Sequence, residues 1–318
     1  MAGITIVETN LLSISFQSFN WCMELFKLEG IIPPMVTPFK ESEELDEEAL
    51  RREVGRLLDA GVHGLTVCGS TGEGYAMTSE EIGLTTAIVK EEVKGRVPVI
   101  TGIIADSAWV ALRHARAAKE AGADALMVTP VHYVFQPTEE GTLDYFKRIG
   151  EALDLPIVIY NVVPWANISA ELAVKLTGIK QIQGIKQSGG DIHGLADMIR
   201  AVGNRIPVLT AIDDMLFPSF LIGAKGAIAA ICTIAPQLCL ELWEAARRGD
   251  IKTGVEIHHR LLPVWRAIGR GDMPARAKEA LSQLGRPAGI ARSPLIPVDE
   301  RARVEIRKAL LEAGLLEK

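Results

Sequence analysis

The sequence lacks the features that mark several large classes of protein. It has no long run of basic residues and its net charge is −6, which argues against nucleic acid as a partner. No segment combines the length and the apolarity of a membrane-spanning helix, so we expect no membrane partner. The four cysteines show no C-x-x-C spacing and no dense pattern. We therefore expect buried thiols in a reducing, cytoplasmic compartment rather than disulfides or a metal site.

What the chain does contain is typical of a soluble enzyme. It has 318 residues, of which 48% are hydrophobic and 23% are charged. This length fits one large α/β domain with a small appendage and allows a substantial core.

The first 29 residues differ from the rest, and we predict an extension that is not part of the core. Residues 4–7 and 11–16 are apolar, but no basic segment precedes them and no A-x-A cleavage site follows. A secretory signal is therefore not expected. Met23 stands just before the first motif-bearing segment, and our hypothesis is that the natural start lies there.

From residue 30 onward, apolar strand-like runs alternate with amphipathic helical stretches. Strands are expected at 30–38, 64–69, 97–102, 125–130, 156–161, 181–188, 207–212 and 226–231. Helices are expected between them at 46–60, 79–93, 107–121, 138–152 and 170–177. Eight strands about 20 to 35 residues apart, each followed by a helix, predict a (β/α)8 TIM barrel over residues 30–235.

Two further expectations complete the fold. Additional helices at 236–249, 251–268, 274–285 and 299–313 predict a C-terminal helical region, 236–318, packed on the barrel. The alternative fold is a doubly wound open sheet, for which we would expect a dinucleotide-binding G-x-G-x-x-G turn after an early strand. Residues 69–74 read GSTGEG and do not match it.

Lys186 is the most informative residue. It ends a short apolar strand of the kind found inside parallel sheets, where an ammonium group is costly to bury. Burial favours the neutral amine, which attacks ketones to form a Schiff base. The alternative is a lysine that simply reaches from the strand end into water.

In a barrel of this type the chemistry gathers at the carboxyl ends of the strands. The side chains expected there are Thr37, Ser70, Thr71, His132, Tyr133, Tyr160 and Lys186. One lysine, phenols, hydroxyls and glycine amides suit imine chemistry on an anionic keto acid better than metal hydrolysis or glycoside cleavage.

Each of these residues also has a simpler interpretation. The turn at 69–73 could hold a carboxylate through amides and hydroxyls, or it could be a tight turn with a capping serine. Tyr133 could relay protons, or it could pack at the barrel mouth with a solvated hydroxyl. His132 is the competing proton carrier.

Other acidic and imidazole groups are expected to have structural roles. Asp213 and Asp214 follow the seventh strand, where helix capping is favoured over catalysis. Glu73 is interpreted as a helix-start residue rather than a base. His258 and His259 have no acidic or cysteine neighbours at ligand spacing, so a metal role is not expected.

Several stretches, in this order and spacing, resemble the dihydrodipicolinate synthase/N-acetylneuraminate lyase family of class I aldolases. They are GIIPPMVTPF at 30–39, GSTGE at 69–73, GADA at 122–125 with TP at 129–130, IYN at 159–161, GIK at 184–186, LIGAKG at 221–226, AP at 235–236 and RSPL at 292–295. The resemblance extends over residues 30 to 315 and implies a TIM barrel.

The resemblance also implies roles for individual residues. Lys186 would form a Schiff base with pyruvate or a related 2-keto acid, and Ser70 and Thr71 would hold its carboxylate. Tyr133 would act as the general acid/base, and Tyr160 would shape the pocket. The family further implies a homotetramer, arranged as a dimer of dimers, with no metal and no organic cofactor.

The chain departs from the family pattern in three places. Where the synthase branch reads Asn-Val-Pro-Ser-Arg-Thr-Gly, residues 161–168 contain no arginine, and Trp165 offers an apolar or stacking surface there. The segment after the fourth strand is longer, so either His132 or Tyr133 could take the acid/base position. Gln187 replaces the acidic residue that often follows the lysine.

The sequence therefore favours a Schiff-base-forming lyase, an aldolase or a dehydratase, acting on pyruvate or another 2-keto acid. One alternative is dihydrodipicolinate synthase proper, against which the missing arginine argues. Another is a regulator that binds a keto acid without turning it over. An unrelated phosphate-binding barrel is disfavoured, because residues 211–214 read AIDD where a glycine-rich phosphate turn would be needed.

Overall fold

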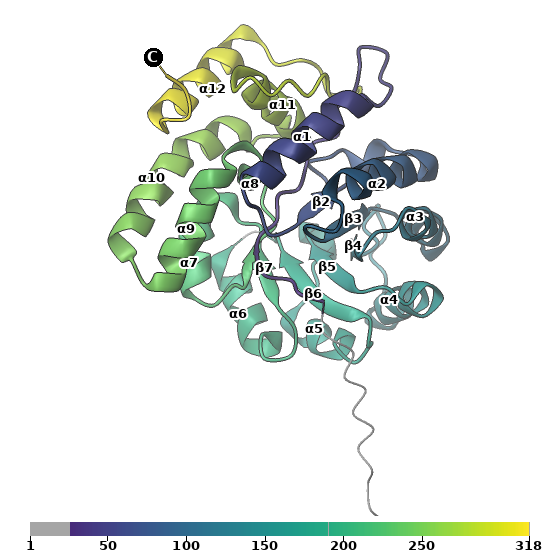
Figure 1. The fold of residues 1–318 in the computed structure, drawn as a ribbon. Coiled ribbons are helices and arrows are strands. Elements are labelled where there is room, and N and C mark those ends of the chain that lie inside the picture. The colour runs from purple at the N-terminus through teal and green to yellow at the C-terminus, as the bar shows by residue number, and fades with distance from the viewer. Residues whose placement is uncertain (1–25, 190, 318) are drawn as a thin grey trace, which may run out of the picture.

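The computed structural model describes residues 26–189 and 191–317. Its centre is a sheet of eight strands in which all neighbouring strands run parallel (Figure 1). The strands are β1 (Gly30–Ile31), β2 (Leu65–Val67), β3 (Val99–Ile103), β4 (Ala125–Val128), β5 (Ile157–Asn161), β6 (Ile182–Gln187), β7 (Val208–Thr210) and β8 (Gly226–Ala227). All eight lie within or overlap the runs expected from the sequence.

The sheet closes on itself as a barrel. Its strand order is β1-β8-β7-β6-β5-β4-β3-β2, so β1 and β2 are its two ends. A parallel bridge between Pro34 and Thr66 joins these ends. There the amide of Thr66 donates to the carbonyl of Pro33 (2.9 Å) and the amide of Met35 donates to that of Thr66 (2.8 Å). The predicted (β/α)8 barrel is confirmed, and the doubly wound alternative is wrong.

Helices alternate with the strands and surround the barrel (Figure 1). Local capping starts several of them: Asp46 accepts from the amide of Ala49, and Thr78 and Glu81 form a reciprocal capping box. These helices are α1 (Glu47–Asp59), α2 (Ser79–Val93), α3 (Ala108–Glu120), α4 (Glu139–Leu153), α5 (Ala170–Leu176), α6 (Ile192–Val202) and α7 (Leu216–Leu221). The first five were expected at these positions, whereas α6 and α7 follow the predicted alternation of strand and helix but had no expected bounds.

The eighth strand is shorter than expected. The apolar run 226–231 was interpreted as a strand throughout, but β8 ends at Ala227 and Ile231 begins α8 (Ile231–Ile234). The amide of Ile231 donates to the buried carboxyl of Asp213 (2.8 Å), which removes it from any strand pairing. Periodicity alone could not separate a short buried strand from a short buried helix here.

The predicted C-terminal helices are present as α9 (Pro236–Arg248), α10 (Ile251–Ile268), α11 (Met273–Gln283) and α12 (Glu300–Glu312). They form a C-terminal helical region beside α1 and α7 (Figure 1). Helix α9 contacts α7 and β1, and α10 contacts α9 and α12. Arg286, just after α11, forms a buried ion pair with Glu53 of α1, which ties this region to the barrel. The division of the chain at residue 235 stays a prediction.

The inside of the barrel is filled by one small cluster of buried side chains. Its members are Leu28, Ile32, Ile100, Ala125, Met127, Val158, Tyr160, Leu209 and Ile228. Leu28 lies in this cluster although the sequence suggested that it belongs to the extension. Most of that extension, including Met23, lies outside the described residues.

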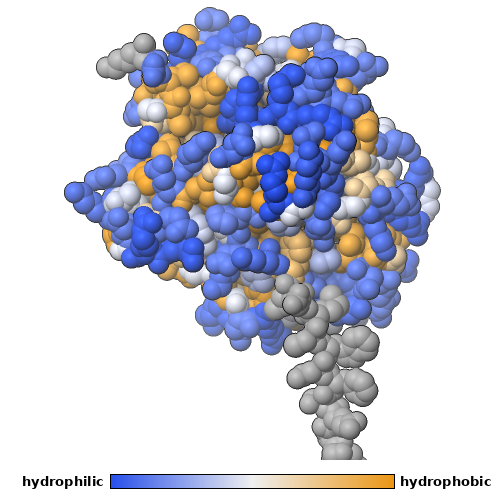
Figure 2. Space-filling view, viewed as in Figure 1, coloured by the Kyte–Doolittle hydropathy of each residue, from blue (hydrophilic) through white to orange (hydrophobic). Residues whose placement is uncertain are grey.

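The surface is mixed, with hydrophobic residues exposed between hydrophilic ones on the face drawn in Figure 2. Among the described residues, no helix is both long enough and apolar enough to cross a membrane. Cys68, Cys232 and Cys239 are free and buried, whereas Cys22 lies outside the described residues.

Candidate active site at the carboxyl ends of the strands

Lys186 lies near the end of β6 with only 3% of its surface exposed. The parallel register pairs it with Tyr160 on β5 and with Leu209 on β7. Its ammonium nitrogen is 3.8 Å from the centre of the Tyr160 ring. The π face of an aromatic ring attracts a cation, which offsets part of the penalty of burying it. Of the two interpretations of Lys186, the buried one is therefore confirmed.

Tyr160 links this lysine to the turn that follows β2. Its ring is buried, and its hydroxyl donates a hydrogen bond to Oγ of Ser70 (3.1 Å). Lys186, Tyr160 and Ser70 thus form a continuous group that comes from three separate elements. A phenol in contact with a hydroxyl and next to an amine is suited to proton transfer during imine chemistry.

The turn at residues 68–74 is tightly folded. Cys68 and Glu73 both adopt the left-handed conformation, at φ 55°. A Cβ atom at Gly74 would overlap the carbonyl of Cys68, and one at Gly72 would lie 2.7 Å from the carbonyl oxygen of Met35. These glycines are required because the backbone approaches so closely. Thr71 is buried within the turn.

Cys68 is not a competing nucleophile. Its side chain is fully buried, and burial raises the pKa of its thiol well above the ordinary value. The thiol therefore stays protonated at neutral pH, and it is the thiolate that reacts.

The loop after β5 is held in place by Asn161. The Asn161 amide nitrogen donates to the carbonyl of Ile168 and to the side chain of Gln187, both at 2.9 Å. Its oxygen accepts from the amide of Ile168 (2.8 Å). Residues 162–167 therefore project from a fixed base, and Trp165 at their tip is 64% exposed.

His132 and Tyr133 lie on the loop after β4, where Asp106 organises the backbone. The Asp106 carboxylate accepts from the amides of His132 (3.0 Å) and Tyr133 (2.8 Å). The carbonyl of His132 accepts from the indole nitrogen of Trp165 (2.8 Å), so the loops after β4 and β5 are joined. The Tyr133 ring is 72% exposed. The single chain thus brings Tyr160 to Lys186 and leaves Tyr133 in solvent.

Asp213 is a buried carboxyl near Lys186. From the sequence we expected only a helix-capping role for it and did not anticipate this position. Burial raises its pKa to about 7, while the bond from the Ile231 amide and the charge of Lys186 lower it. The expectation that it caps the next helix is wrong, because α7 begins without a side-chain cap. The Asp213 carboxyl accepts instead from the amide of Ile231, the first residue of α8. Its neighbour Asp214 pairs instead with Arg266 (3.1 Å).

Within the described residues, no group of three or more His, Cys, Asp or Glu side chains is arranged to hold a metal ion. The expectation that the enzyme uses no metal stays a prediction.

Comparison with known proteins gives this arrangement its context. The model of the dihydrodipicolinate synthetase family matches residues 27–313. The 4-hydroxy-tetrahydrodipicolinate synthase of Methanopyrus kandleri is 35% identical over 295 residues, which cover 92% of this chain and 98% of the relative. The chain belongs to the dihydrodipicolinate synthetase family. It is therefore a lyase of the class I aldolase type, as the resemblance implied.

Solved structures of the family agree with the fold. A chloride-inhibited dihydrodipicolinate synthase from Acinetobacter baumannii, solved with pyruvate, has a TM-score of 0.86 at 29% identity and covers 91% of this chain and 100% of its own. A prophage protein of the same family from Escherichia coli K12, also solved with pyruvate, has a TM-score of 0.86 at 30% identity and covers 91% and 99%.

Proposed function

We propose that the protein forms a Schiff base between Lys186 and pyruvate or a closely related 2-keto acid, and that it makes or breaks a carbon–carbon bond next to that imine. The observation that carries this proposal is the buried Lys186 nitrogen 3.8 Å from the centre of the Tyr160 ring. Membership of the family supports it, and so do the pyruvate complexes of the two similar structures.

The reaction begins at the keto carbon. The Lys186 amine attacks this carbon, and the keto oxygen leaves as water. The imine then loses a proton from the adjacent carbon and becomes an enamine, whose carbon attacks the carbonyl of an aldehyde. The aldehyde oxygen takes up a proton, and water finally hydrolyses the new imine to release Lys186. In the opposite direction the same steps cleave the bond.

The residues around Lys186 suit these steps. The amides and hydroxyls of Ser70 and Thr71 would hold the keto acid's carboxylate; this role is supported by the Ser70 hydroxyl, which accepts from the phenol that lies against Lys186. We assign proton transfer to Tyr160, because its hydroxyl already donates to Ser70 next to the amine. Tyr133 and His132 remain candidates for the same role if a second copy of the chain covers their exposed loop.

The first candidate for the overall reaction is the synthesis of 4-hydroxy-tetrahydrodipicolinate. The Methanopyrus kandleri relative is named for this reaction, and this chain is similar to it over nearly its full length. A different aldehyde, or a dehydration, is the second candidate. It is favoured by the absence of arginine from residues 161–168 and by the exposed indole of Trp165, which suits a less charged distal group.

We also propose that the protein assembles as a homotetramer. Exposed apolar side chains on the loops after β4 and β5 support an interface between copies: Tyr133, Val134, Phe135 and Trp165. Native mass spectrometry gives the subunit number directly, and a monomer would contradict this part. The cytoplasmic location stays a prediction, supported by the free buried thiols.

The central test is borohydride reduction in the presence of pyruvate, followed by peptide mass mapping. We expect a pyruvate-derived adduct on Lys186, and an unlabelled Lys186 would overturn the proposal. A panel of aldehydes that includes aspartate semialdehyde and uncharged aromatic aldehydes then separates the two reaction candidates. Labelling without turnover of any aldehyde or 2-keto acid would favour the binding regulator instead.

A further inference from the structure

Glu73 ends the turn that carries Ser70 and Thr71, in a conformation that suits glycine better. Its φ is 55°, in the left-handed region, and its side chain is completely buried. The same turn has glycine at positions 72 and 74. A buried carboxylate at a strained position suggests that the carboxylate itself has a task.

Both oxygens of this carboxylate bind the C-terminal helical region. Oε1 forms an ion pair with Nζ of Lys278 on α11 (2.6 Å), and the two side chains are 1% and 2% exposed. Oε2 accepts from the backbone amide of Arg292 (2.8 Å), in the loop between α11 and α12. Lys278 also donates to the carbonyl of Ile290 in that loop. The pair is thus fully enclosed and joins segments about two hundred residues apart in the chain.

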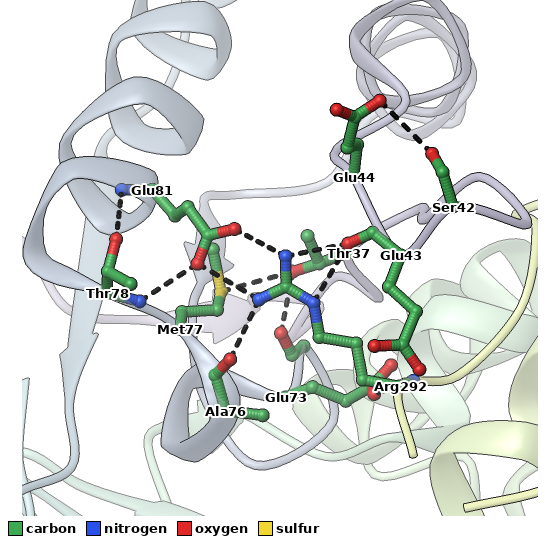
Figure 3. A network of polar contacts seen from close by, with 11 residues as sticks. Thr37, Ser42, Glu43, Glu44, Glu73, Ala76, Met77, Thr78, Glu81 and Arg292 are labelled. Atoms are coloured by element: carbon green, nitrogen blue, oxygen red, sulfur yellow. Dashed lines mark hydrogen bonds and ion pairs between the residues drawn. The ribbon is translucent and has the colours of Figure 1, made fainter.

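Arg292 extends the same contact to the residues after the turn (Figure 3). Its guanidinium donates to the carbonyl of Ala76 (2.7 Å) and pairs with Glu81 of α2. It also lies 4.1 Å from the centre of the Phe39 ring, and the Lys278 nitrogen lies 4.6 Å from the same ring. Hydrogen bonds and ion pairs therefore attach the C-terminal helical region to the segment from residue 73 to residue 81.

A residue of the barrel also binds the turn, at Gly72. The hydroxyl of Thr37 donates to the carbonyl of Gly72 (2.6 Å). Ser70 and Thr71 lie between β2 and these two attachments, and Ser70 accepts from Tyr160. A shift of residue 73 would move the hydroxyls and amides that face the keto acid's carboxylate.

We propose that the buried Glu73–Lys278 pair positions the Ser70–Thr71 turn, so that the C-terminal helical region sets the affinity for the keto acid without touching it. Glu73 and Lys278 are positioning residues in this proposal. It rests on the proposed function, because it takes the turn as the carboxylate site.

A second buried ion pair supplies the matched control. Arg286 and Glu53 also join the C-terminal region to the barrel, and their side chains are 13% and 4% exposed. The Arg286 side chain donates to Glu53 on α1 and to the carbonyls of Thr233 and Ile234, and none of these hydrogen bonds goes to residues 68–74. Breaking this pair also leaves a buried charge unpaired, and so it reproduces any general loss of stability.

The experiment compares Lys278→Met, Glu73→Gln and the control Glu53→Gln. For each variant one measures the pyruvate concentration that gives half-maximal borohydride trapping on Lys186, at a temperature where circular dichroism shows the variant folded. We expect this concentration to rise about tenfold in Lys278→Met and Glu73→Gln, as when a hydrogen bond to a charged group is weakened. We expect less than a twofold change in Glu53→Gln, and the trapping rate at saturating pyruvate to stay within about twofold in all three.

The outcomes separate this inference from the proposed function. If wild-type Lys186 is not trapped, the proposed function is wrong and the inference falls with it. If the wild type is trapped but the half-saturating concentration stays within twofold in the turn variants, only the inference is overturned. An equal rise in Glu53→Gln would also overturn it, because general destabilisation would then explain the effect. Should Lys278→Met fail to fold, the isosteric Glu73→Gln decides alone.

Discussion

Lys186 and Tyr160 face each other across one pair of strands, with the amine 3.8 Å from the centre of the phenol ring. Their Cα atoms are partners in the β5–β6 register, and neither residue depends on a loop for its position. The phenol hydroxyl then reaches Ser70 beyond β2. Regular strand pairing thus sets the relation between nucleophile and phenol, which keeps both within reach of the same bound keto acid.

The first prediction concerns the nucleophile. We expect Lys186→Met to lower turnover by about 10³-fold or more, because a thioether cannot form an imine. The melting temperature should stay the same or rise, since the change removes a buried ammonium group and keeps an apolar chain of similar length. Steady-state kinetics and a thermal melt check both parts. A variant that retains most of the turnover would show that imine formation at Lys186 is not required.

The second prediction distinguishes the two phenols. Tyr160→Phe keeps the ring over Lys186 and removes the hydroxyl that donates to Ser70. We expect trapping with pyruvate to persist while turnover falls by about 10² to 10⁴-fold, the usual effect of losing a general acid/base. Tyr133→Phe is the matched variant, and we expect a smaller fall. If instead Tyr133→Phe has the larger effect, Tyr133 has the role that the family resemblance implied.

Much of the fold was predictable because its local signals are strong. Thr78 and Glu81 form the reciprocal cap at the start of α2. The first and last residues of this helix agree with the range predicted from the sequence, 79–93. The end of β8 was not predictable in the same way. Residues 226–231 are uniformly apolar, and the hydrogen bond that the amide of Ile231 donates where α8 begins goes to Asp213, 18 positions away in the chain.

The sequence allowed us to predict which residue types form the site, but not which of these side chains contact one another. The position of Lys186 at a strand end was visible in the sequence, whereas the register that pairs it with Tyr160 depends on the closed barrel. The family resemblance implies the acid/base role for Tyr133 and a pocket-shaping role for Tyr160, although it is Tyr160 that lies in a matching stretch, IYN at 159–161. The contact between Glu73 and Lys278 spans 205 positions, and no local pattern could indicate it.

The third prediction concerns the distal end of the substrate. Trp165→Phe keeps an aromatic ring but removes the donor to the carbonyl of His132, which joins the loops after β4 and β5. A neutral hydrogen bond contributes about 0.5–1.5 kcal/mol, so we expect the KM for the aldehyde to rise about two- to tenfold. The half-saturating pyruvate concentration should not change, because Lys186 and Ser70 are untouched. An equal change for both substrates would mean that this loop is not specific to the distal group.

The fourth prediction is a pH dependence that comes from Asp213. Burial raises the pKa of this carboxyl to about 7 in the folded protein, against about 3.9 when it is unfolded. The folded state therefore binds the proton more tightly, and the resulting stability is fully present below about pH 4. It is lost as the pH rises to about 7, where the buried carboxyl ionises.

Asp213→Asn should abolish this loss, since the amide oxygen of asparagine can still accept from the Ile231 amide. We expect the variant's free energy of unfolding, relative to wild type, to be larger at pH 8 than at pH 5 by about 2–3 kcal/mol. Urea unfolding at several pH values measures the difference. Asp214→Asn is the control, because Asp214 is more exposed and pairs with Arg266, and its difference should not grow with pH in this way. If the two variants show the same pH profile, the Asp213 carboxyl ionises normally in the folded protein and its burial beside Lys186 does not hold the proton.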